Sequence, residues 1–67
     1  MKLLVIGAGV GQVPIIEKAK MRGLHVTVVS RPGNHPGFAL ADAVFECDIY
    51  DRDRIADYAR ENGITAV

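Results

Sequence analysis

The chain has 67 residues, 49% of them hydrophobic, and its eight Lys and Arg residues balance its eight Asp and Glu residues. This composition predicts one soluble globular unit and excludes a disordered segment. Because the net charge is zero and the basic residues are scattered, the sequence argues against a nucleic-acid partner.

The apolar segments and the cysteine content predict a cytoplasmic protein. The apolar run at residues 3–6 is too short to span a membrane and no signal-peptide cleavage pattern follows it, so no membrane partner is expected. Cys47 is the only cysteine, which excludes an internal disulfide and fits a reducing compartment. We expect Cys47 to be a small buried hydrophobic residue. A domain of about 60 residues buries only about 60% of its surface, so a large self-contained catalytic cleft is not expected.

The first part of the sequence predicts a strand, a helix and a second strand. Residues 2–6 form a run of branched apolar residues that ends at a glycine, the pattern of a strand buried on both faces. Residues 12–22 have the composition and apolar spacing of a helix, with Gly23 in place for a C-terminal cap. Residues 24–29 are rich in β-branched residues and predict the second strand.

The next part predicts a long loop, a third strand and a second helix. Turn residues are concentrated at 31–37, and residues 38–41 are expected to form one helical turn. Residues 43–47 predict the third strand. Asp51 is placed to cap a helix that covers residues 52–61.

This alternation of strands and helices predicts an α/β fold, a Rossmann-like open parallel sheet of about four strands with helices on both faces. Residues 64–67 supply the fourth strand, and the expected strand order is three-two-one-four. Because no helix follows this strand, the single domain at residues 1–67 is interpreted as truncated. Its uncovered edge, with Ile64, Ala66 and Val67, is expected to make the chain a homo-oligomer.

A glycine-rich turn follows the first strand and is the best candidate for a ligand site. Gly7, Gly9 and Gly11 precede a helix, which places bare backbone N–H groups and the positive end of the helix dipole at one point. Gly7 permits a tight turn, and Gly9 lacks the Cβ atom that would keep a ligand away from the backbone. The turn is therefore expected to bind a small anionic molecule.

This turn matches the dinucleotide-binding fingerprint only in part. The fingerprint has its third glycine where this chain has Gln12, and an acidic residue after the second strand where this chain has Ser30 and Arg31. The missing acidic residue disfavours NAD. Ser30 and Arg31 leave NADP open, because they are suited to holding a 2′-phosphate.

Four groups of residues, in order along the chain, carry a resemblance to a known family. They are residues 2–6 with Gly7-x-Gly9-x-Gly11-Gln12, then Pro36-Gly37 with Ala41-Asp42, then Asp48 followed by Asp51 and Ile55, and lastly the run at 59–67. In this order they resemble the N-terminal (pre-ATP-grasp) domain of ATP-grasp ligases, such as the carbamoyl-phosphate synthase large subunit and aminoimidazole ribonucleotide carboxylating enzymes. The family usually has an acidic residue at the position of Ser30, and often an Asp at that of Thr65.

The resemblance implies that this chain helps to bind the acceptor substrate of an ATP-dependent ligase and carries no catalytic residue itself. ATP and Mg would be held by two further ATP-grasp domains, so this segment alone is expected to bind no cofactor. Asp48 joins the candidate site because ligands of open α/β sheets bind at the carboxyl ends of strands. The substrate-binding candidates are Gly7, Gly9, Gly11, Gln12, Ser30, Arg31 and Asp48.

Other chemically active residues have ordinary explanations. His25, His35 and Asp48 have the loose spacing of unrelated residues, so no metal site is expected. Tyr50 is near enough to the candidate site to stack on a base, although packing is the default for it and for Tyr58. No Ser-His-Asp or Cys-His set can be assembled, which argues against nucleophilic catalysis by this chain alone.

Two alternatives to a ligase segment stay open at this point. One is the first half of an NADP-binding domain of an oxidoreductase, and the other is a structural module with no ligand. A coding sequence that continues past Val67 into a glycine-rich, Lys-containing ATP-grasp region would favour the ligase, whereas a second βαβ half would favour the oxidoreductase.

Overall fold

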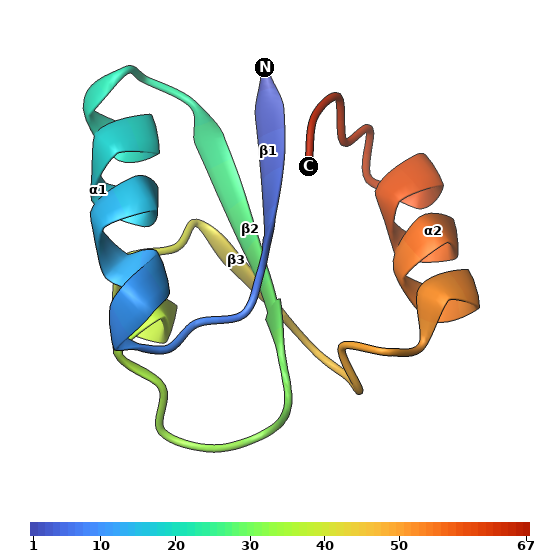
Figure 1. Ribbon diagram of the computed structural model, residues 1–67. Helices are drawn as coiled ribbons and strands as arrows, with labels where there is room; N and C mark the ends of the chain where they lie inside the picture. Colours follow the sequence, from blue (N-terminus) through green and yellow to red (C-terminus); the bar gives the residue numbers. More distant parts are fainter.

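Three parallel strands and two helices build the fold in the computed structural model, which describes all of residues 1–67. β1 (Lys2–Ile6), β2 (His25–Ser30) and β3 (Ala43–Glu46) form one sheet in the order β1-β2-β3. α1 (Val13–Met21) covers one face of the sheet and α2 (Arg52–Glu61) covers the other (Figure 1). The predicted α/β class, with parallel strands and helices on both faces, is confirmed.

The register of the strands brings their carboxyl ends to one edge of the sheet. β1 pairs with β2 from Lys2 beside His25 to Ile6 beside Val29. β3 pairs with β2 up to the last residue of each strand. The loops that follow the three strands therefore leave the sheet side by side, which is where ligands of open α/β sheets bind.

The prediction of a complete fourth strand at residues 64–67 is wrong, because only Ala66 pairs with β1, in an isolated parallel bridge to Leu3. This bridge lies on the side of β1 away from β2, so residues 64–67 lie beside β1, as the predicted strand order requires. Thr65 N and Ala66 N both donate to Lys2 O, at 3.0 and 3.2 Å, and Leu4 N donates to Ala66 O at 2.9 Å. Two neighbouring N–H groups that share one carbonyl do not form the evenly spaced pattern of a parallel ladder. The Thr65 hydroxyl accepts a hydrogen bond from Lys2 N at 3.2 Å and donates one to Lys2 O at 3.1 Å, so Lys2 N has a side chain as its partner here.

The core has one layer on each side of the sheet. Between the sheet and α1 lie Val5, Ala8, Ile16, Ala19, Val26 and Val28. Between the sheet and α2 lie Leu4, Val29, Cys47 and Ile55, so the prediction that Cys47 is buried is confirmed. β2 is the central strand and is buried on both faces, which explains why its valines do not keep to alternate positions. The predicted packing of Tyr58 is confirmed by its stacking on Phe45, with ring centroids 4.4 Å apart.

The ends of the two helices follow from local signals. α2 has the predicted bounds, and the Asp51 side chain caps it by accepting a hydrogen bond from Arg54 N at 3.2 Å. α1 begins one residue later than predicted, because Val10–Gln12 form a separate 3-10 turn, η1. Gly23 ends α1 in the left-handed conformation, with φ +78°. Neither helix has the length and apolar character needed to cross a membrane.

Asp42 joins three elements at the amino-terminal edge of the sheet. Its carboxylate accepts a hydrogen bond from Val26 N at 2.7 Å, and its own N–H donates to Val26 O at 2.8 Å. The same carboxylate forms an ion pair with Lys20 of α1. The hydrogen bond from Lys20, and after it the one from Val26 N, lower the pKa of Asp42 below its ordinary value. Asp42 thus fixes the start of β3 against β2 and α1.

Candidate functional site

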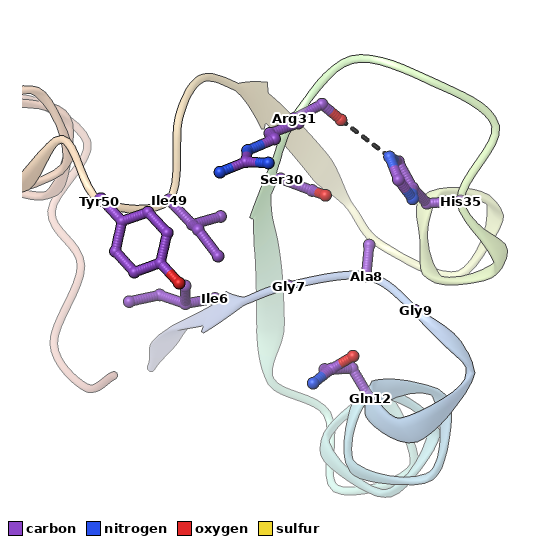
Figure 2. A pocket seen from close by; sticks show the side chains of 10 residues that line it. All are labelled: Ile6, Gly7, Ala8, Gly9, Gln12, Ser30, Arg31, His35, Ile49 and Tyr50. Carbon is purple, nitrogen blue, oxygen red and sulfur yellow. Dashed lines mark hydrogen bonds between the residues drawn. The ribbon is translucent and has the colours of Figure 1, made fainter.

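A cleft of about 450 Å³ opens at the carboxyl edge of the sheet (Figure 2). It lies where the loops after β1 and β2 meet the segment that follows β3. Its lining residues are Ile6, Gly7, Ala8, Gly9, Gln12, Ser30, Arg31, His35, Ile49 and Tyr50. The structure therefore brings five of the seven predicted site residues to one cleft, and it places Gly11 and Asp48 outside the lining.

The glycine turn leaves backbone donors free at the floor of this cleft. Gly7 has φ +100°, a conformation that a side chain would strain, and its N–H still donates to Val29 O at 2.7 Å. Gln12 N donates to Gly9 O at 3.0 Å and closes the 3-10 turn η1. The N–H groups of Ala8 and Gly9 have no acceptor within the chain. Free N–H groups at the start of a helix favour an anion.

The loop after β2 is held against this turn by a close backbone contact. Residues Pro36–Ala39 form a 3-10 turn, η2, close to the helical turn that was predicted slightly later in the chain. Gly37 within it is buried, and its N–H donates to Ala8 O at 2.8 Å. A Cβ atom on Gly37 would lie 3.1 Å from that same oxygen and 2.8 Å from Ile16 Cδ1. The absence of a side chain at Gly37 is therefore what allows the loop to approach the glycine turn.

Ser30 and Arg31 give the cleft one wall and its positive charge. Ser30 is buried at the end of β2, and its carbonyl accepts a hydrogen bond from Cys47 N at 3.0 Å. The exposed guanidinium of Arg31 lies 3.7 Å from the Asp48 carboxylate and 6.0 Å from the centre of the Tyr50 ring. An exposed ion pair at this distance is weak, so Arg31 stays available to a ligand anion.

Asp48 supports the cleft from its rim. Besides its contact with Arg31, its carboxylate accepts a hydrogen bond from Tyr50 N at 2.9 Å, which orders the turn between β3 and α2. Gly11 is exposed in η1, and no other part of the chain lies within 4 Å of the position that its Cβ atom would take. The two residues therefore shape or flank the site instead of lining it.

Five lining residues were absent from the predicted set: Ile6, Ala8, His35, Ile49 and Tyr50. His35 Nε2 lies 2.9 Å from Arg31 O, and its ring meets Phe38 edge-on with centroids 5.0 Å apart. Tyr50 had a signal in the sequence, since it follows the third strand and is aromatic. His25, by contrast, lies at the start of β2, the far end from the cleft, and no group of His, Cys, Asp or Glu is placed to hold a metal ion.

Two solved structures contain a segment that is similar to this chain. Phosphoribosylglycinamide synthetase from Anaerococcus prevotii is 31% identical over 97% of this chain, with a TM-score of 0.85. N5-carboxyaminoimidazole ribonucleotide synthetase from Thermotoga maritima is 27% identical over 90% of this chain, with a TM-score of 0.78. These likenesses support an ATP-grasp N-terminal domain. They do not single out carbamoyl-phosphate synthase.

This chain covers only a small part of each of the two similar structures. The chain spans 17% of the length of each of the two structures. No protein-family model matches the sequence, and a search of curated proteins returns no significant match. The likeness therefore concerns one α/β segment, and the activity of a whole ligase is a separate question.

Proposed function

We propose that this chain is the substrate-binding N-terminal segment of an ATP-grasp ligase, an ATP-dependent enzyme that joins a carboxylate to an amine or ammonia. The observation that carries the proposal is the cleft, whose lining includes Arg31 together with Ala8 and Gly9, two residues whose N–H groups have no acceptor within the chain (Figure 2). This arrangement suits one anionic group of a small acceptor substrate. The structural likeness to two synthetases supports the enzyme class.

The anionic group is proposed to be a phosphate on a ribose. The names of both similar structures contain a phosphoribosyl or ribonucleotide group. A phosphate monoester has the charge and the acceptor oxygens that the glycine turn and Arg31 can satisfy together. The sugar would then lie toward Tyr50 and Ile49, which provide apolar surface on the third side of the cleft. The sequence resemblance suggests carbamoyl-phosphate synthase as a narrower assignment. The names of the two similar structures favour a ligase that acts on a phosphorylated ribose over that assignment.

The chemistry of ligation lies outside these residues. In such a ligase an acyl phosphate is attacked by an amine, ammonia or another nucleophile, and this segment contributes by holding the acceptor in place. No Asp or Glu side chain lines the cleft, so the site does not fit Mg²⁺ with a nucleotide triphosphate. ATP and Mg are therefore assigned to further domains of the enzyme.

The first half of an NADP-binding domain is the second candidate, and one observation favours it. Ser30 and Arg31 directly follow β2, where NADP-binding domains hold the 2′-phosphate. Against it stands Gln12, which occupies the position of the third glycine of the fingerprint. We therefore rank this candidate below the ligase segment.

Titrations of the chain with ribose 5-phosphate, ribose, ATP and NADP test the proposal. Ribose 5-phosphate should bind with a dissociation constant on the order of 1 mM, roughly −4 kcal/mol, and ribose should not bind detectably. Arg31→Ala should weaken binding about fivefold, since an exposed charge contact contributes roughly 1 kcal/mol. Arg22→Ala, at the far end of α1, is the matched control and should have no effect. A dissociation constant below about 10 μM for ATP or NADP, roughly −7 kcal/mol, would contradict the proposal.

A further inference from the structure

The side chain of Gln12 lies against the glycine turn. A Cβ atom on Gly7 would be 3.2 Å from Gln12 Cδ and 3.4 Å from Nε2, and one on Gly9 would be 3.4 Å from Oε1. The carboxamide therefore covers the faces of the two glycines that the missing side chains leave bare. Figure 2 shows it on the α1 side of the turn, with Ser30 and Arg31 on the opposite side.

Helix stability does not explain this position of Gln12. The residue is the N-cap of α1, yet its side chain makes no capping hydrogen bond. Glutamine is not among the residues that favour an N-cap, where the shorter Ser, Thr, Asp and Asn accept from the first turn. Its carboxamide is only partly buried and lines the cleft. The side chain is thus directed toward the ligand site and not toward its own helix.

Dinucleotide-binding domains have a glycine at the position of Gln12. There the first two glycines let the pyrophosphate approach the backbone, and the third glycine keeps the helix close to the first strand. In this chain the 3-10 turn η1 comes before α1, and the Gln12 side chain fills the space beside the first two glycines. One side of the turn is closed, and the side facing Ser30 and Arg31 stays open.

We propose that Gln12 sets the ligand specificity of the turn: its carboxamide leaves room for a single phosphate group and sterically excludes a diphosphate. This inference rests on the proposed anion site and adds to it the residue that separates a phosphate monoester from a dinucleotide. It also explains how a strand, glycine turn and helix with an NADP-like Ser30-Arg31 pair can belong to a ligase segment.

The test compares inorganic phosphate with inorganic pyrophosphate in three forms of the chain: wild type, Gln12→Ala and Gln12→Met. The readout is the ratio of the two affinities, measured from the shifts of backbone amide resonances, with circular dichroism as the check of folding. Gln12→Ala removes the carboxamide and should raise the ratio in favour of pyrophosphate at least about tenfold, because the second phosphate gains charge-assisted hydrogen bonds to the turn. Gln12→Met keeps a side chain of similar size and should keep the wild-type ratio.

Two outcomes would overturn the inference. One is a ratio of pyrophosphate to phosphate affinity in Gln12→Ala that equals the wild-type ratio. The other is a ratio in Gln12→Met that rises as far as in Gln12→Ala, because the size of the side chain would then not be what excludes pyrophosphate. NADP provides an independent measurement, and its affinity should rise in Gln12→Ala only. If neither phosphate nor pyrophosphate shifts the resonances of Ala8 and Gly9 in the wild type, the proposed anion site fails instead, so the two failures are distinguishable.

Discussion

Replacing Gly37 by Ala tests whether the loop after β2 holds the glycine turn in place. The added Cβ atom would lie 2.8 Å from Ile16 Cδ1, 3.1 Å from Ala8 O and 3.2 Å from Ala8 Cα. Ile16 Cδ1 is the end of a side chain and can move, but the two atoms of Ala8 belong to the backbone of the turn. The loop must therefore shift, and the hydrogen bond from Gly37 N to Ala8 O, now 2.8 Å, must lengthen.

The expected loss is large for a chain of this size. Overpacking a buried position costs about 1–3 kcal/mol, and the weakened hydrogen bond adds up to about 1 kcal/mol. A chain of this length has a free energy of unfolding of roughly 3–10 kcal/mol. We expect Gly37→Ala to lower it by about 2 kcal/mol, which corresponds to a fall in Tm of roughly 8–16 °C.

Urea denaturation followed by circular dichroism measures this loss, and Gly11→Ala is the matched control. Nothing in the chain lies within 4 Å of a Cβ atom on Gly11, and its φ is not positive. Alanine there should stabilise the chain by about 0.4–1 kcal/mol, because it lowers the entropy of the unfolded state. If Gly37→Ala unfolds within about 0.5 kcal/mol of the wild type, or if both variants lose the same stability, the packing argument is wrong.

Three further predictions concern the ion pair of Asp42 with Lys20, the cap of α2 and the glycine turn. The pKa of Asp42 is lowered in the fold, so its ion pair with Lys20 should stabilise the chain at neutral pH and lose this effect as pH falls below about 4. The urea midpoints measured at pH 7 and pH 3 should therefore differ less in Asp42→Asn than in the wild type. Asp51→Ala removes the cap of α2 and should cost about 0.5–2 kcal/mol in the same assay; an unchanged midpoint would contradict the cap. Gly9→Val should weaken binding of ribose 5-phosphate, because its side chain would meet the Gln12 carboxamide at 3.4 Å and displace it within the cleft. The Tm should stay within about 4 °C, because Gly9 has ordinary extended dihedrals; unfolding with normal binding in the surviving fraction would make Gly9 a structural residue.

The sequence predicts most of the layers, because their signals are local. A continuous apolar run that ends at a glycine identifies β1 as a strand, and richness in β-branched residues identifies β2. α2 begins and ends where predicted, because Asp51 supplies a cap at one end and Gly63, with φ +68°, ends the helix at the other.

The two errors lie at the ends of predicted elements. The segment at residues 64–67 has the composition of a strand, but the Thr65 hydroxyl bonds both backbone groups of Lys2, and only Ala66 forms a bridge to β1. Period and propensity do not report such competition between a side chain and the ladder. α1 begins one residue later than predicted, because the 3-10 turn η1 occupies the residues directly before Val13.

The candidate site could be predicted only where its residues lie on one segment or at a strand end. Gly7, Gly9 and Gln12 lie on one turn, and Ser30 and Arg31 end the next strand, so the rule for open α/β sheets finds them. The part played by His35 depends on the fold of the long loop, which Gly37 sets by contact with the glycine turn. Such contacts between distant segments leave no periodic signal in a single sequence.

The backbone amides of Ala8 and Gly9 report most directly on whether the glycine turn holds the phosphate of a small substrate. Titration of isotope-labelled chain with ribose 5-phosphate should shift these two resonances first and furthest, together with the Arg31 side chain, and ribose should leave them in place. The largest shifts elsewhere, for example around Lys18 and Arg22 on α1, would contradict the account.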